Sequence, residues 1–147
     1  MIAIGCDHGG YELKKTIMKA FSDIDFKDYG TFSTDSVDYP DVAIPVAESV
    51  ASGECEKGIL ICRSGVGMDI MANKVDGIRA ALCFNSKVAE MAKRHEDVNI
   101  ITIGADYVSN EEAIKIVKVW LANKFEGDRH QRRIDKIKNY ELAKRNK

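Results

Sequence analysis

The chain has 147 residues, 45% of them hydrophobic and 31% charged, which is the composition of one compact soluble domain over residues 1–147. Its formal net charge is -1, so we do not expect the broad basic surface that nucleic-acid binding needs. No apolar run is long enough to span a membrane, and the first residues lack a signal-peptide pattern. The four cysteines (Cys6, Cys55, Cys62 and Cys83) have no CxxC or zinc spacing, which predicts reduced thiols in a cytoplasmic protein.

Short apolar runs alternate along the chain with helical patterns. We expect strands at residues 1–6, 24–29, 58–62, 78–83 and 99–103, most of them continuously apolar as in strands buried on both faces. Helices are expected at residues 13–21, 42–50, 68–74, 85–94 and 109–123, and a last one after Gly127. This alternation predicts an α/β fold, a three-layer doubly wound sandwich with a five-stranded parallel sheet, which is Rossmann-like.

The end of the chain differs from the rest in charge. Residues 124–147 carry nine Lys and Arg against four Asp and Glu, whereas the remainder is acidic. A basic segment on an acidic body indicates an anion site or docking onto an acidic neighbour, and a solvated surface helix is the alternative.

Ligands of parallel sheets bind at the carboxyl ends of the strands, so the residues that follow each strand are the candidates for a site. Asp7 and His8 follow the first strand, and Tyr39 lies in the loop after the second. Residues 63–69 follow the third strand, and residues 104–106 follow the last.

A glycine-containing turn, residues 63–67, leads from a strand into a helix. Its backbone N–H groups and the helix N-terminus favour an anion, although a tight turn that needs small residues is the alternative. The sequence matches neither GxGxxG nor a Walker loop. Cys62 precedes this turn, where the helix N-terminus favours the thiolate form, and it is therefore a candidate base or nucleophile; packing is the alternative.

Histidines and arginines supply the other candidates. His95 ends an expected helix, and His8 adjoins Asp7. Arg129 and Arg133 are four residues apart and would share a helical face that could bind phosphate, with plain surface charge as the alternative. The histidines and carboxylates have no known metal-ligand spacing, so no metal is expected.

Seven motifs together are more specific than any one of them. They are GCDHGGYELK (residues 5–14), VDYPD (37–41), GILIC followed by SGVGM (58–68), IMANKV (70–75), GIRAALC (77–83), RHEDVNIITIG (94–104) and FEGDRHQRR (125–133). In order and spacing they resemble the type B ribose-5-phosphate isomerases, the family that also holds galactose-6-phosphate isomerase subunits. The resemblance covers residues 2–137.

The resemblance implies interconversion of an aldose phosphate and a ketose phosphate, without metal or cofactor. The implied substrate is ribose 5-phosphate, which becomes ribulose 5-phosphate through an enediolate, a step of the pentose phosphate pathway. By matching position, Cys62 would be the base that moves a proton between two carbons. His95 would open the sugar ring with the help of Asp7. The enediolate oxygens would be held by Ser64 and the amides of Gly65, Val66 and Gly67.

The resemblance also implies how the substrate is bound and how the chains assemble. His8, Arg129 and Arg133 would bind the phosphate, and Tyr39 would line the pocket. Family members are dimers, often tetramers, in which each site takes residues from two subunits. We therefore expect a homodimer or homotetramer, with the basic C-terminal helix, about residues 128–147, in the dimer contacts.

Four positions depart from the family pattern. Arg63 and Asp128 stand where Gly is usual, Glu96 where Asn is usual, and Asp106 where a phosphate-binding Arg is usual. One hypothesis is that Arg63 supplies the cation lost at position 106. The alternative is that Glu96 and Asp106 repel phosphate, giving a different substrate or no catalysis. Asp69 is a rival to Cys62 as the base.

Three functions therefore remain open on the sequence. The first is ribose-5-phosphate isomerisation. The second is isomerisation of a hexose 6-phosphate, allose or galactose. The third is a non-catalytic phosphosugar-binding module. The simultaneous presence of Cys62, Asp7 and His95 favours an enzyme, because binding alone needs no base.

Overall fold

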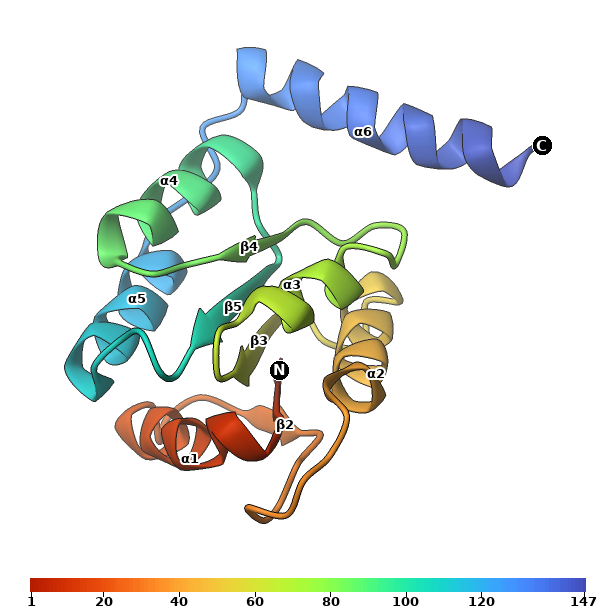
Figure 1. Cartoon of the computed structure of the whole chain (residues 1–147). Helices are drawn as coiled ribbons and strands as arrows, with labels where there is room; N and C mark the ends of the chain where they lie inside the picture. The colour runs from red at the N-terminus through yellow and green to blue at the C-terminus, as the bar shows by residue number, and fades with distance from the viewer.

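The computed structural model describes residues 1–147 and contains one parallel sheet with strand order β2-β1-β3-β5-β4 (Figure 1). The strands are β1 (Ile2–Cys6), β2 (Phe26–Asp28), β3 (Lys57–Cys62), β4 (Ala80–Leu82) and β5 (Ile100–Gly104). The helices are a 3-10 turn (His8–Gly10), α1 (Tyr11–Ala20), α2 (Tyr39–Ala51), α3 (Val66–Ala72), α4 (Ser86–Glu96), α5 (Asn110–Ala122) and α6 (Arg129–Arg145). The predicted three-layer α/β fold is confirmed.

Two apolar cores lie on opposite faces of the sheet. On one face, side chains of α1, α4 and α5 pack against alternate residues of β1, β3 and β5 such as Ile4, Ile59 and Ile101. On the other face, α2 and α3 pack against the intervening residues such as Ala3 and Leu60. Every residue of β1 and β5 is buried, which explains why these segments are continuously apolar instead of alternating.

The helix that follows the second strand begins earlier than expected. Tyr39 is the first residue of α2 and not part of a loop. Pro40 fits the first helical turn, because its missing N–H would have no helical acceptor there. Tyr39 is therefore held on a helix at the carboxyl edge of the sheet.

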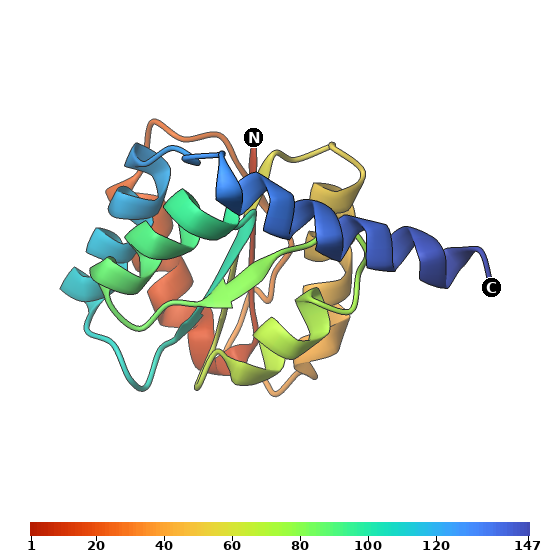
Figure 2. The ribbon, with the colours of Figure 1, turned by 90° about the horizontal axis from the view of Figure 1, so that it is seen from above.

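The last helix, α6, lies outside the sandwich. It crosses the sheet at the β4 side and projects past the other layers, so the C-terminus lies away from the body (Figure 2). Glu141 on α6 accepts a hydrogen bond from Gly77 N–H at 2.9 Å. Ile137, Tyr140 and Leu142 remain exposed on this helix although they are apolar. None of the helices combines the length and apolar character needed to cross a bilayer.

Candidate active site

The Cys62 thiol lies at the carboxyl end of β3, directly below the start of α3. Its Sγ is buried and accepts a hydrogen bond from Gly65 N–H at 3.1 Å. Gly65 has φ +78°, and a Cβ there would lie 2.5 Å from Leu82 Cδ1 and 2.9 Å from the Ile103 carbonyl carbon. Only glycine fits this position without strain, so the turn holds its amide against the sulfur. An anionic sulfur accepts such a bond more strongly than a neutral one.

The other buried thiols are in different surroundings. Burial raises the pKa of Cys6 to about 11, and burial together with the Asp69 charge raises the pKa of Cys83 to about 12. Both therefore stay protonated near neutral pH. Among the sulfurs, Cys62 is the one that accepts a backbone N–H at a helix start.

Asp7 and His8 follow β1, the strand next to β3. Asp7 N–H donates to Ile61 O at 3.1 Å, which fixes Asp7 beside the end of β3. Its Oδ1 accepts hydrogen bonds from Gly9 N–H and Gly10 N–H at 2.9 and 3.2 Å and so caps the 3-10 turn. His8 Nδ1 accepts a hydrogen bond from Val37 N–H at 3.3 Å, and this bond does not use the second ring nitrogen, Nε2. The carboxylate and the imidazole are thus both held at this edge.

Tyr39 and Ser64 complete the carboxyl-edge cluster, which we define as Asp7, His8, Tyr39, Cys62, Ser64, Gly65, Val66 and Gly67. A Cβ on Gly67 would lie 2.8 Å from Tyr39 Cζ, so the tyrosine ring packs directly on the glycine turn. Ser64 Oγ accepts a hydrogen bond from Val66 N–H at 3.2 Å. The structure therefore places the predicted residues that follow β1 and β3, together with Tyr39 at the start of α2, at the same edge of the sheet.

Two of the positions that depart from the family pattern meet at the rim of this cluster. Arg63 Nη1 lies 3.8 Å from Asp106 Oδ2, and Arg63 O accepts a hydrogen bond from Asp106 N–H at 2.9 Å. Both side chains are more than half exposed, at 68% and 52%, so the ion pair is weak and can open. The two departures therefore compensate each other in charge.

Asp69, the rival base, lies in the first turn of α3 and is bonded to the sheet. Its Oδ1 accepts a hydrogen bond from Thr102 Oγ1 at 3.1 Å, and burial raises its pKa. Thr102 is fully buried on β5, so this bond joins α3 to the sheet.

The remaining predicted residues lie at the opposite end of the sheet. α4 starts just after the carboxyl end of β4 and runs back against the strands, so His95 and Glu96 at its C-terminus lie at the amino edge. The ring centroids of His95 and His130 are 4.3 Å apart, which places the start of α6, with Arg129 and Arg133, beside them. A five-residue strand is about 17 Å long, so within one chain this group and the carboxyl-edge cluster are too far apart to form a single site.

Glu126 and His130 belong to this amino-edge group, although no role was predicted for them. Glu126 Oε1 lies 3.8 Å from the Nε2 atoms of both His95 and His130. Their position inside the motif FEGDRHQRR was the available signal, because this motif also contains Arg129 and Arg133. We define His95, Glu96, Glu126, Arg129, His130 and Arg133 as the amino-edge cluster.

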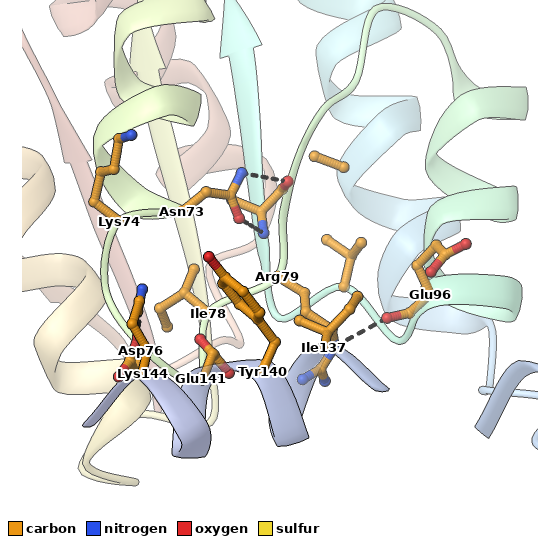
Figure 3. A pocket seen from close by; sticks show the side chains of 13 residues that line it. Asn73, Lys74, Asp76, Ile78, Arg79, Glu96, Ile137, Tyr140, Glu141 and Lys144 are labelled. Atoms are coloured by element: carbon orange, nitrogen blue, oxygen red, sulfur yellow. Dashed lines mark hydrogen bonds and ion pairs between the residues drawn. The ribbon is translucent and has the colours of Figure 1, made fainter. Parts of the chain in front are cut away.

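The largest hollow of the chain, about 480 Å³, lies between α6 and the β4 edge (Figure 3). Tyr140 and Ile137 line it from α6, and Arg79, whose Nε donates to Glu96 O at 3.0 Å, lines it from the sheet side. A second hollow of about 380 Å³ adjoins the glycine turn and is lined mainly by apolar side chains such as Phe84 and Tyr107. Neither hollow contains Cys62 together with His95.

The structure is a parallel α/β protein whose candidate ligand site comprises a thiol, a carboxylate and the backbone amides of a glycine turn. The comparison with protein families is more specific. The sequence model of the Ribose/Galactose Isomerase family matches residues 2–137, and the chain belongs to this family.

Individual relatives agree with this assignment. The chain is 46% identical over 143 residues to a putative sugar phosphate isomerase of Bacillus subtilis, covering 95% of this chain and 96% of that protein. It is 44% identical to ribose-5-phosphate isomerase B of Escherichia coli, covering 92% and 93% of the two chains. The solved structure of Clostridium thermocellum ribose-5-phosphate isomerase B superposes with a TM-score of 0.94 at 47% identity, with 97% of each chain covered. Mycoplasma genitalium ribose-5-phosphate isomerase B, solved with bound ribulose 5-phosphate, has a TM-score of 0.92 at 43% identity, covering 96% and 95%.

Proposed function

We propose that this protein interconverts ribose 5-phosphate and ribulose 5-phosphate, without a metal or an organic cofactor. The observation that carries the proposal is the Cys62 Sγ at the end of β3, which accepts the Gly65 N–H and has Asp7 and Tyr39 beside it. A base next to a set of backbone donors is what proton transfer alpha to a carbonyl needs. Relatives named for this activity, one of them solved with ribulose 5-phosphate, support the choice of substrate.

The proposed reaction moves one proton between two carbons of the open-chain sugar. The Cys62 thiolate removes the proton from C2 of the aldose. The C–H electron pair forms the C1–C2 double bond of an enediolate, and the π electrons of the C1 carbonyl move to O1. The resulting thiol returns a proton to C1, while the hydroxyl proton of O2 passes to O1. The negative oxygens accept hydrogen bonds from Ser64 and the amides of residues 65–67. Each such donor typically contributes about a hundredfold or more to the rate.

We propose further that the active unit is a homodimer, or a tetramer made of such dimers, in which the amino-edge cluster of one copy completes the carboxyl-edge cluster of the other. His95 would then open the sugar ring, and Arg129 and Arg133 would join His8 in binding the phosphate. The distance between the two clusters within one chain supports this arrangement. So do exposed apolar side chains near the glycine turn, such as Val66, Ile70 and Phe84, and the projecting helix α6.

Complementation between inactive variants tests the shared site. Mixed dimers of Cys62→Ala and His95→Ala would contain one site with both changes and one site with neither. If the sites are shared, unfolding and refolding the two variants together restores about a quarter of the wild-type turnover, because half of the dimers are mixed. Unmixed variants are the control, and no recovery despite mixed dimers would contradict the shared site.

The substrate is tested by offering ribose 5-phosphate, allose 6-phosphate and galactose 6-phosphate to the purified protein, with Cys62→Ala as the control. We expect the highest kcat/KM on ribose 5-phosphate. Faster turnover of a hexose phosphate would show that the substrate is a hexose and not a pentose. Tight binding without any turnover would show that the protein is a phosphosugar-binding module and not an enzyme.

We place this activity in the cytoplasm, since the four cysteines are all unpaired.

A further inference from the structure

We propose that Glu126 and His130 are positioning residues that orient His95 for opening the sugar ring. The geometry points to a triad in which the Glu126 carboxylate holds Nε2 of His95 while the buried His130 ring supports the His95 ring from one face. This inference rests on the proposed function, in which His95 is the ring-opening group.

The Glu126 carboxylate is held so that one oxygen is free for the histidines. Its Oε2 accepts a hydrogen bond from Arg94 Nε at 2.6 Å, and its backbone N–H donates to Arg94 O at 3.0 Å. The other oxygen, Oε1, lies 3.8 Å from both imidazole Nε2 atoms. Hydrogen bonds at active sites are often long without substrate and shorten when it binds. Arg94 therefore anchors the carboxylate, and the two lone pairs of Oε1 can accept hydrogen bonds from the imidazole N–H groups.

The His130 ring stacks against one face of the His95 ring. Its side chain is nearly fully buried, and its ring lies parallel to that of His95, with 9° between the planes and 4.3 Å between the centroids. Its Nε2 is buried without a hydrogen-bond partner. Such an orphaned polar atom is costly, and Glu126 Oε1 is the acceptor that faces it. The stack fixes the plane of the His95 ring, which alone would rotate about its side-chain bonds.

The charges around Glu126 and the two histidines favour a shared proton over a metal ion. The three ligand atoms lie within 4.8 Å of one another, which is a spacing that a cation could use. However, Arg94 of α4 and Arg129 and Arg133 of α6 face the group, against Glu126 and, on α4, Glu90. Burial, His95 and Arg129 lower the pKa of His130, while Arg94 lowers the pKa of Glu126. The Glu126 carboxylate is therefore ionised, and simultaneous protonation of both stacked rings is unfavourable.

This arrangement selects one tautomer of His95. When Nε2–H of His95 faces Glu126, the lone pair of the neutral ring is on Nδ1. The His95 side chain is 28% exposed, whereas that of His130 is 6% exposed, so His95 is the ring that substrate can reach. Nδ1 can then accept the proton of the anomeric hydroxyl and deliver one to the ring oxygen as the ring opens, with no net change in protons.

The test compares Glu126→Gln with Glu90→Gln. Glu90 is a matched control because its carboxylate also contacts Arg94, at 3.1 Å, but neither histidine. Two reactions are measured. Conversion of ribose 5-phosphate needs ring opening. Exchange of the C1 hydrogen of ribulose 5-phosphate in D2O does not, because this ketose is open-chain: its O5 carries the phosphate. The histidine Cε1–H resonances are titrated by NMR in parallel.

For Glu126→Gln we expect kcat on ribose 5-phosphate to fall about tenfold or more with KM changed less than threefold, and deuterium exchange to stay within threefold of wild type. The His130 resonance should titrate at lower pH, because the negative charge of Glu126, which raises the pKa of His130, is lost. Glu90→Gln should leave all three near wild type.

Three results would overturn the positioning role. One is unchanged ribose 5-phosphate turnover in Glu126→Gln, another is an equal loss of turnover and exchange, and the third is an unchanged histidine titration. Failure of the proposed function is recognised separately, because wild-type protein would then catalyse neither the conversion nor the exchange. Glu126→Asp, which keeps the charge, should recover most of the lost turnover.

Discussion

The two ends of the sheet carry different kinds of chemistry. At the carboxyl edge the donors are mainly backbone amides around one thiol, and their places are set by a glycine turn and a short helix. At the amino edge the groups are long charged side chains, held by ion pairs such as Arg94 with Glu126. Backbone donors are rigid and suit a developing oxyanion, whereas arginines suit a phosphate that must bind and leave. The proposed substrate, a sugar phosphate that passes through an enediolate, would need both ends of the sheet.

The largest expected effect is at the thiol. Cys62→Ala should reduce turnover about a thousandfold or more, because it removes the proposed base that takes and returns the proton. Asp69→Asn should cost much less, since Asp69 bonds to Thr102 within the protein. Steady-state kinetics on ribose 5-phosphate measure both. A loss confined to Asp69→Asn would transfer the role of base to that carboxylate.

The next effect concerns the backbone of the carboxyl edge. Gly65→Ala combines an unfavourable positive φ with a clash against Leu82 and Ile103. We expect about 2–4 kcal/mol of lost stability in denaturant unfolding and a lower kcat. Gly53→Ala is the matched control, because Gly53 has φ +84° but nothing within 4 Å of a Cβ, and should cost only about 1 kcal/mol. Equal losses would show that the close approach of Gly65 to Leu82 and Ile103 is unimportant.

A smaller effect is expected at the rim. Arg63→Gly should raise the KM for sugar phosphate at least tenfold, about 1.4 kcal/mol, if Arg63 leaves Asp106 to contact the phosphate. Asp106→Asn should lower KM, because it removes the competing carboxylate 3.8 Å away. An unchanged KM in Arg63→Gly would contradict the hypothesis that Arg63 supplies the phosphate-binding cation.

The smallest effect belongs to the amino edge and depends on pH. The pKa of His130 in the folded protein lies below its ordinary value of 6.5, mainly because of burial. Below pH 6.5 the unfolded chain binds more protons at this residue than the folded one, so the free energy of unfolding falls as the pH falls toward the folded pKa. His130→Asn should flatten this part of the stability profile. Urea unfolding between pH 5 and 7.5 measures the slopes.

Much of the fold was predictable because it is encoded locally. The apolar runs at Ile2–Cys6 and Ile100–Gly104 are strands in the structure, and the basic segment after Gly127 is a helix. The start of α2 was wrong by three residues, because the preference of Pro40 for a first helical turn was not used. Boundaries of this kind depend on weak local preferences that neighbouring structure readily overrides.

By itself, the sequence determined the layers of the fold and the turn from Cys62 to Gly67, because a strand, a tight turn and a helix start involve neighbouring residues. Only the tertiary structure decided that His95 and the arginines lie at the far end of the sheet, since this depends on the direction in which α4 runs against the strands. It likewise decided the contact of Arg63 with Asp106 and that of Glu126 with His95, which are separated by 43 and 31 positions along the chain. Contacts of that range result from packing, and no local pattern in the chain specifies them.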